Sequence, residues 1–451
     1  MRDIELHKQI KLFCEESFEY VTRLVSKLGD KAPTRIAEKF LIVDDHTTSH
    51  YQDTVIDWSR LIFNIEKDLQ KFDSYKKATN SLNNHEIFGK QLNTLVGTSS
   101  SMRRLDTNEF LLQFFLISLL IESDKTVFEE EKFKRLYENT ENWFYSETLR
   151  IRYFAPISNF SMEQDRLELD PGFAIIRIKK KEKEKLMSTS SAFHSTFQIL
   201  TSKEYAFEFI AEQKKCIGER TKNAEEGLNP EKTAKSWFRN ACFALRLFKS
   251  GLIGFNHIWI IDTNWDFSGI QSTSSNLGPS EYMGDHMTIS VKEVPAFLEL
   301  WQRYKKISQR RLKKILNSIA RLNFGTERNR HEDKLIDYFV AFESLFLSKK
   351  DPELRYRLSL LTSHWVGSTS SERKKIFRII KIGYDQRSTI VHGGDPEQLI
   401  SFDGANITFA EHTKLVEDYL RLSIKKFIAE CADNNKNEVQ LVEELQDRIL
   451  E

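Results

Sequence analysis

From Val294 to the end of the chain, segments of helix length alternate with short polar breaks, and this pattern constrains the fold most. Helices are expected over residues 295–323, 333–348, 353–365, 372–392 and 409–432. With only 17 glycines and 8 prolines in 451 residues, but 33 phenylalanines, the chain favours long helices with aromatic cores. Five helices with short connections predict a compact bundle, which we place over residues 301–451.

The first 300 residues show a mixed pattern. Helical periodicity is expected over 13–28, 58–72, 110–121, 127–137 and 237–249. Strand-like runs follow at 172–179, 255–261 and 287–291, with a loop over 268–284. We therefore expect an α+β N-terminal region over residues 1–300, of one or two subdomains, followed by an all-α bundle.

Composition and targeting signals favour a soluble cytoplasmic protein with no membrane partner. The four cysteines lie far apart and form no C-x-x-C pair, which fits a reducing compartment. The first residues are too charged for a signal peptide. The most apolar run, from Phe110 to Ile121, covers about 12 residues, whereas a bilayer span needs roughly 20.

Basic residues are concentrated in the C-terminal region. From Trp301 onward the chain has 27 Lys+Arg and 22 Asp+Glu, which leaves 40 and 44 for the rest. Ten cations stand against the single acid Glu327 in one stretch: Arg303, Lys305, Lys306, Arg310, Arg311, Lys313, Lys314, Arg321, Arg328 and Arg330. On one continuous helix, several of them would line a single face. Such a stripe either contacts RNA phosphates or is a solvated surface, and the sequence leaves both open.

No familiar cofactor or metal motif is present. The sequence lacks a Walker A loop, G-x-G-x-x-G, G-x-S-x-G and H-E-x-x-H. His46 and His50 are four apart, as two zinc ligands on a helix would be, but they follow a strand-like run without an evident third ligand. We interpret this segment as a polar loop and expect neither a metal nor a cofactor.

The segment from Tyr384 to Gly394 contains Arg387 and His392 with four residues between them. The spacing alone is common by chance. However, Arg387 continues an apolar stripe formed by Ile376, Ile380, Gly383 and Val391. We expect Arg387 to face the core, where an unpaired charge is unfavourable. His392 stands at the expected helix end, before two glycines that can cap the helix and let a ligand approach closely.

A carboxylate borders the buried face of the helix expected over 333–348. Its core stripe consists of Leu335, Phe339, Phe342 and Phe346. Glu343 lies four residues from both Phe339 and Leu347, so it sits at the edge of this stripe. Its expected partner is Arg387 or Arg357. The pair is either a structural ion pair or part of a functional cluster.

Several of these features together resemble the HEPN superfamily, and more narrowly its ApeA-like branch, over about residues 325–430. They are the bundle, the Ala341-Phe-Glu-Ser-Leu-Phe helix, the Tyr356-Arg-Leu-Ser segment and the Arg-Ser-x-x-x-His-Gly ending. The resemblance implies a metal-independent endoribonuclease in which two protomers juxtapose their Arg-x4–6-His motifs. It assigns catalysis to Arg387 and His392, with Glu343 as the supporting residue. Ser388 stands where the family often has asparagine.

The chemistry is compatible with these residues. A neutral histidine can take the proton of the RNA 2′-hydroxyl, and a guanidinium can stabilise the charge that develops on phosphorus. The resemblance also implies a homodimer through the bundle, and we expect Arg310, Arg311, Lys313, Lys314 and Arg357 to contact RNA. Family members often act as toxins or antiphage effectors.

The N-terminal region would supply substrate choice, sensing of an activating signal, or restraint. The alternative hypothesis is a non-catalytic RNA-binding or interaction module built on the same bundle. The sequence identifies neither the RNA that is cut nor an antidote or regulatory partner.

Overall fold

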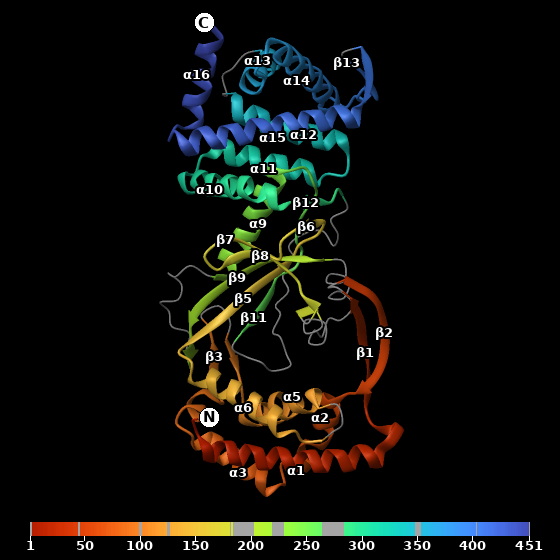
Figure 1. Cartoon of the computed structure of the whole chain (residues 1–451), viewed down its shortest axis with the longest axis vertical. Coiled ribbons are helices and arrows are strands. Elements are labelled where there is room, and N and C mark those ends of the chain that lie inside the picture. Colours follow the sequence, from red (N-terminus) through yellow and green to blue (C-terminus); the bar gives the residue numbers. More distant parts are fainter. Residues whose placement is uncertain are drawn as a thin grey trace. The chain divides into compact units, whose positions relative to one another are not determined.

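The computed structural model shows an α+β region followed by a helical region, as predicted (Figure 1). It describes residues 2–43, 46–98, 102–123, 127–180, 182–183, 203–218, 230–263, 284–347, 353–402 and 404–450. The chain forms two compact units. The N-terminal unit comprises residues 1–157, 165–236 and 255–278, and the C-terminal unit comprises 158–164, 237–254 and 279–451. The division thus differs from a single boundary at residue 300, because residues 158–164, 237–254 and 279–300 belong to the C-terminal unit.

Helices make up much of the N-terminal unit. They are α1 (Ile4–Leu28), η1 (Gly29–Lys31), α2 (Trp58–Leu69), α3 (Asp73–Asn84), α4 (Phe88–Gln91), the π-helical η2 (Glu109–Leu116), α5 (Ile117–Glu122) and α6 (Glu130–Tyr145). Helix α1 begins earlier than expected, because the Asp3 side chain accepts a hydrogen bond from the Leu6 backbone N–H and caps its first turn. The apolar run expected as a buried helix forms η2 and α5.

An antiparallel sheet of five strands completes this unit. Its strands lie in the order β11 (Trp259–Asp262), β5 (Thr148–Pro156), β9 (Tyr205–Lys214), β8 (Phe173–Arg177) and β7 (Arg166–Asp170). The expected strand after the Asp-Pro turn is β8, and Gly172 takes the left-handed φ of 75° that the turn requires. Smaller pairings are the hairpin of β1 (Thr34–Val43) with β2 (His46–Ile56), and the sheet of β10 (Cys216–Ile217), β3 (Leu95–Gly97) and β4 (Met102–Arg104).

The C-terminal unit is a helical bundle with two small β elements. Its helices are α9 (Pro230–Phe248, which enters this unit at Trp237), η4 (Val291–Glu293), α10 (Val294–Arg310), α11 (Lys313–Glu327), α12 (His331–Phe346), α13 (Leu354–Val366), α14 (Ser370–Val391), α15 (Phe409–Asp433) and α16 (Glu438–Leu450). Its strands are β6 (Phe160–Met162) paired with β12 (Met287–Ile289), and β13 (Leu399–Phe402) paired with β14 (Ala405–Thr408). Phe427 of α15 packs against Phe346 and Trp365, with ring centroids 5.3 and 4.4 Å away. These contacts join three helices in one aromatic core.

The helices expected after residue 330 are confirmed as α12 to α15. The prediction of a single helix over 295–323 is wrong, because α10 ends at Arg310 and α11 starts at Lys313. Arg311 between them has a left-handed φ of 53°. The N–H of Leu312 donates to the Ile307 carbonyl and that of Arg311 to the Ser308 carbonyl, and the side chains of Leu312 and Ile307 are buried. These features are those of a Schellman motif, which closes a helix without glycine here.

The sequence pattern also missed α16 and the β13–β14 hairpin, which lies in a segment expected to be a polar break. The loop expected over 268–284 falls almost entirely outside the described residues. Over the described ranges, every helix is too short or too polar to cross a lipid bilayer.

Candidate functional site

Glu343 and Arg387 meet at one end of the bundle. Glu343 lies near the C-terminus of α12 and Arg387 near the C-terminus of α14, and Nη2 of Arg387 is 3.7 Å from Oε1 of Glu343. Of the two partners left open for Glu343, Arg387 forms the ion pair. The side chains of Glu343 and Arg387 are 26% and 22% exposed, respectively. The pair thus lies at the edge of the core, where solvent can reach it, and Arg387 is less buried than the apolar stripe predicted.

Tyr384 is a third member of this cluster that the sequence interpretation did not assign. Its ring stands edge-on to the buried Phe339 at 5.7 Å, and the guanidinium carbon of Arg387 is 5.7 Å from its centroid. Burial, the negative charge of Glu343 and a hydrogen bond to Glu343 raise the pKa of the Tyr384 hydroxyl, which therefore stays protonated at neutral pH. The signal was available, because Tyr384 precedes Arg387 by three residues and shares its helix face.

Arg387 keeps an unused donor. Among the described residues, nothing accepts a hydrogen bond from its buried Nε. A buried N–H without an acceptor is unfavourable, so the guanidinium keeps hydrogen-bonding capacity that the fold does not use. Glu343 and Tyr384 hold the guanidinium in place, and the exposed part of the side chain lets an anion from solvent approach it.

The end of α14 presents His392 to solvent. Gly393 has a left-handed φ of 83°, its N–H donates to the Ile390 carbonyl, and the N–H of Gly394 donates to the Thr389 carbonyl. This is the glycine cap that the sequence predicted. The chain beyond it is tied back to the helix, since the buried Gln386 side chain accepts from the Glu397 N–H at 2.8 Å. His392 therefore occupies a defined turn although its side chain is exposed.

Gly383 brings the helix that bears Arg387 close to its neighbours. A Cβ at this position would lie 2.9 Å from the Phe339 ring and 3.1 Å from the ring of His412. Both rings are fully buried. Only glycine permits this approach of α14 to α12 and α15, and the approach sets how far Arg387 reaches toward Glu343.

Arg357, expected to contact RNA, lies in α13 at the same end of the bundle. The first turn of α13 is joined to α14 by an ion pair between Arg355 and Asp385, 2.7 Å long. Arg357 is half-buried and follows directly in that turn. Its position is compatible with the cluster around Arg387.

The basic stretch does not form the expected stripe, because the break at Arg311 places its residues on two helices. Most of these cations also have partners inside the protein. Arg303 pairs with Asp433, Arg321 and Arg328 pair with Asp337, and Arg330 pairs with Glu332. The excess of positive charge in the sequence is therefore largely compensated within the fold.

Two of the residues expected to bind RNA instead bind the carbonyl ends of helices. The Arg310 guanidinium donates to the Cys431 carbonyl in the last turn of α15 at 2.5 Å and to the Lys436 carbonyl in the connection to α16 at 2.9 Å. Nζ of Lys314 donates to the Leu347 carbonyl at the end of α12, at 3.0 Å. A cation at a helix C-terminus stabilises the unpaired carbonyls there. Arg311 and Lys313 are exposed and remain available to a ligand.

The segment with His46 and His50 was predicted to be a polar loop that binds no metal, and the loop prediction is wrong. Both lie in strand β2 rather than on a loop, and their side chains fall outside the described residues. Within the described part of the chain, no three His, Cys, Asp or Glu side chains gather closely enough to hold a metal ion.

Comparison with known proteins gives no relative. No protein-family model, curated protein or solved structure matches this chain. Function must therefore be inferred from the residues and the geometry of the bundle itself.

Proposed function

We propose that the C-terminal unit is a metal-independent endoribonuclease in which Arg387 and His392 are the catalytic residues and Glu343 positions Arg387. The observation that carries this proposal is a guanidinium held by a carboxylate, with one donor unused, on the helix whose capped end presents His392. The proposal also rests on the resemblance of this segment to the HEPN superfamily.

The reaction would use each group in a distinct role. The imidazole of His392 takes the proton of the 2′-hydroxyl, whose oxygen attacks the adjacent phosphorus, while Arg387 stabilises the charge on the phosphorane oxygens. The bond to the 5′-oxygen then breaks, and that oxygen takes a proton from a second acid. The products are a 2′,3′-cyclic phosphate and a 5′-hydroxyl, and DNA is resistant because it lacks the 2′-hydroxyl.

The test is to incubate the full chain with total RNA in EDTA and to map the new ends. We expect cleavage by the wild type, with cyclic phosphate ends, and its loss in His392→Ala and Arg387→Ala while RNA binding is retained. His364→Ala is the matched control, since His364 lies at the opposite end of α13 from the cluster. Wild-type RNA binding without cleavage would instead support the non-catalytic RNA-binding module, and cleavage that needs a divalent ion would contradict the acid–base mechanism.

A second protomer would supply the missing acid. One His392 can act as base, and protonation of the leaving oxygen needs another group. A two-fold axis beside this end of α14 would bring a second His392 to the same phosphate. Exposed apolar side chains at this end fit such an interface: Leu354, Tyr356, Val391 and Leu399 are 38%, 52%, 52% and 64% exposed.

Mixed dimers test this arrangement. We expect Arg387→Ala and His392→Ala proteins, each inactive alone, to recover partial activity when mixed, because the composite site of the mixed dimer has one Arg387 and one His392, whereas each homodimer lacks one kind of group entirely. The readout is RNA cleavage after subunit exchange, with each variant mixed with itself as the control. A monomer that is fully active at nanomolar concentration would contradict the composite site.

A further inference from the structure

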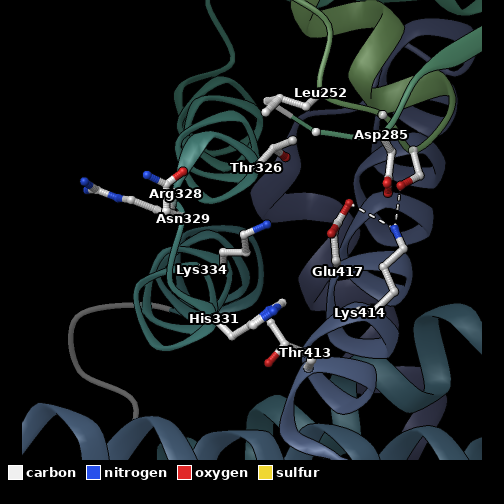
Figure 2. Close-up of a pocket in the computed structure, with 14 residues that line it drawn as sticks. Leu252, Asp285, Thr326, Arg328, Asn329, His331, Lys334, Thr413, Lys414 and Glu417 are labelled. Atoms are coloured by element: carbon white, nitrogen blue, oxygen red, sulfur yellow. Dashed lines mark hydrogen bonds and ion pairs between the residues drawn. The ribbon is translucent and has the colours of Figure 1, made fainter. Parts of the chain in front are cut away.

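A cavity of about 290 Å³ lies in the C-terminal unit, far from the Arg387 cluster. It is enclosed by the turn after α9, the loop before β12, the loop between α11 and α12, the first turn of α12 and the start of α15 (Figure 2). Helix α12 connects the two sites, with His331 at the rim of the cavity and Glu343 in the Arg387 cluster. At a rise of 1.5 Å per residue, these two residues are about 18 Å apart along the helix. The cavity is thus a separate site, just under the roughly 300–1,000 Å³ typical of small-molecule pockets.

One cation in the cavity has no counterion. The side chain of Lys334 points into the cavity (Figure 2), and among the described residues no carboxylate or other acceptor binds its amine. By contrast, Lys414 on the opposite wall is bound by Ser250 Oγ at 2.6 Å and by Glu417 at 3.3 Å. Lys334 is therefore the group that an entering anion would meet.

The backbone adds to this positive end. The first hydrogen bond within α12 runs from the Lys334 N–H to the Arg330 carbonyl, so the N–H groups of the preceding turn have no partner in the helix. No side chain caps them, because Arg330 stands at the N-cap position and pairs with Glu332. The same turn carries two acids, of which Glu332 pairs with Arg330, and neither Glu332 nor Asp333 lines the cavity. On the cavity side, unpaired N–H groups beside a lysine amine favour a phosphate group.

The opposite side of the cavity has a different chemistry. It presents the carboxylates of Asp285 and Glu417 and the hydroxyl of the buried Thr413. Arg421 and Lys414 lower the pKa of Glu417 against the effect of its burial, so Glu417 is ionised and can only accept hydrogen bonds. The Thr413 hydroxyl donates to the Phe409 carbonyl, and Glu417 accepts from Tyr338, Arg421 and Lys414, so both can only accept further hydrogen bonds. Together with Asp285 they suit a partner that donates hydroxyl hydrogen bonds. The only ring among the lining residues is the imidazole of His331, so the cavity offers little to stack on a nucleobase.

We infer that this cavity binds a small phosphorylated polyol, with its phosphate at Lys334 and the first turn of α12 and its hydroxyls at Asp285, Thr413 and Glu417. A sugar phosphate has both halves of this chemistry. The assignment is independent of RNA cleavage, because it uses none of the residues proposed for catalysis.

Calorimetric titration of the full chain with ribose 5-phosphate, ribose and inorganic phosphate tests the proposal. We expect ribose 5-phosphate to bind, inorganic phosphate to bind more weakly, and ribose alone not to bind. Lys334→Ala should weaken ribose 5-phosphate binding by about tenfold or more, since a charge-assisted hydrogen bond is lost. Lys374→Ala, at an exposed lysine of α14 outside the cavity, should leave the affinity unchanged.

Two further variants separate the halves of the site. Asp285→Ala should lower the affinity for ribose 5-phosphate without weakening inorganic phosphate, because the carboxylate serves only the hydroxyls. Ala410→Leu should abolish binding of both by filling the cavity, with the melting temperature reporting that the fold is intact.

Failure of wild type to bind ribose 5-phosphate at millimolar concentration, or equal binding by Lys334→Ala, would overturn the proposal. A loss of RNA affinity in Lys334→Ala without any sugar phosphate binding would also overturn it, by assigning the cavity to RNA. None of these outcomes depends on whether the protein cleaves RNA, so the two proposals fail separately.

Discussion

Arg387 shows how a single side chain is placed between core and solvent. Its position on α14 directs the Arg387 side chain toward Glu343 of α12. The last turn of α14 is nevertheless close to solvent, since Val391 is 52% exposed. A partly exposed ion pair contributes at most about 1 kcal/mol to stability. The pair is therefore a weak stabilising contact, and its main structural effect is to fix the orientation of the guanidinium.

His412, which packs against Gly383 in the same region, gives a pH-dependent prediction. Its side chain is fully buried, its Nε2 lies 3.1 Å from the Ile379 carbonyl, and burial lowers its pKa from 6.5 to about 4. At a pH between about 4 and 6.5, His412 is protonated in the unfolded chain and neutral in the folded chain. The stabilising contribution of neutral His412 is complete above about pH 6.5 and is lost as the pH falls toward 4.

We expect the wild type to lose about 2 kcal/mol of stability from this group between pH 7.5 and pH 5. His412→Gln should not show this loss, so the difference in free energy of unfolding between wild type and variant should be smaller at pH 5 than at pH 7.5. Urea unfolding at both pH values measures these free energies. An equal pH dependence in the two proteins would show that His412 does not titrate in this way.

At the scale of secondary structure, the turn between α10 and α11 decides the role of the basic residues. Sequence periodicity runs through it without interruption, and it predicted one long helix. The structure instead closes α10 with buried Leu312 against Ile307, and this turn directs Arg310 and Lys314 to the carbonyl ends of two other helices.

Neighbouring arginines give a matched test of this interpretation. Arg310→Ala should destabilise the C-terminal unit by about 1–2 kcal/mol, because the last carbonyls of α15 lose a charged donor. Arg311→Ala, one residue further and exposed, should change stability by less than about 0.5 kcal/mol. Urea unfolding followed by circular dichroism measures both. Equal effects of the two substitutions would mean that Arg310 does not act as a helix cap.

At the scale of the whole molecule, the C-terminal unit is assembled from segments that are distant in sequence. Arg246 of α9 is 2% exposed, and its guanidinium donates to the Ile253 carbonyl at 2.8 Å and to Glu327 of α11 at 2.7 Å. The ring of Phe248 also packs edge-on against Phe297 of α10, with centroids 5.6 Å apart. These contacts make α9 part of the bundle although it precedes the expected boundary by more than fifty residues.

Arg246→Ala in the full chain should therefore destabilise the C-terminal unit by about 2–4 kcal/mol, because a buried carbonyl and a carboxylate lose their donor. Hydrogen exchange should become faster in α11 and α15 while α1 and α3 stay unchanged. Lys249→Ala, three residues later and partly exposed, is the control. Faster exchange confined to the N-terminal unit would place α9 with that unit instead.

Local patterns in the sequence left the partner of Glu343 open between Arg387 and Arg357, but they determined the helices α12 to α15, the glycine cap at Gly393 and the positions of Glu343 and Arg387 beside buried helix faces. These features depend on side-chain periodicity and on backbone preferences within a few residues, which a sequence displays directly. Tyr384 belonged to the same pattern and could have been included.

The tertiary structure alone decided the partners of the basic residues, the membership of α9 and the cavity at Lys334. In each case the deciding group comes from a distant segment: the carbonyls of α15 for Arg310, Asp337 for Arg321, and the start of α15 for the cavity wall. A charge in a sequence has no preferred partner until folding brings donors and acceptors together. For this reason the sequence predicted where cations are concentrated, and only the fold showed which of them remain free to bind a ligand.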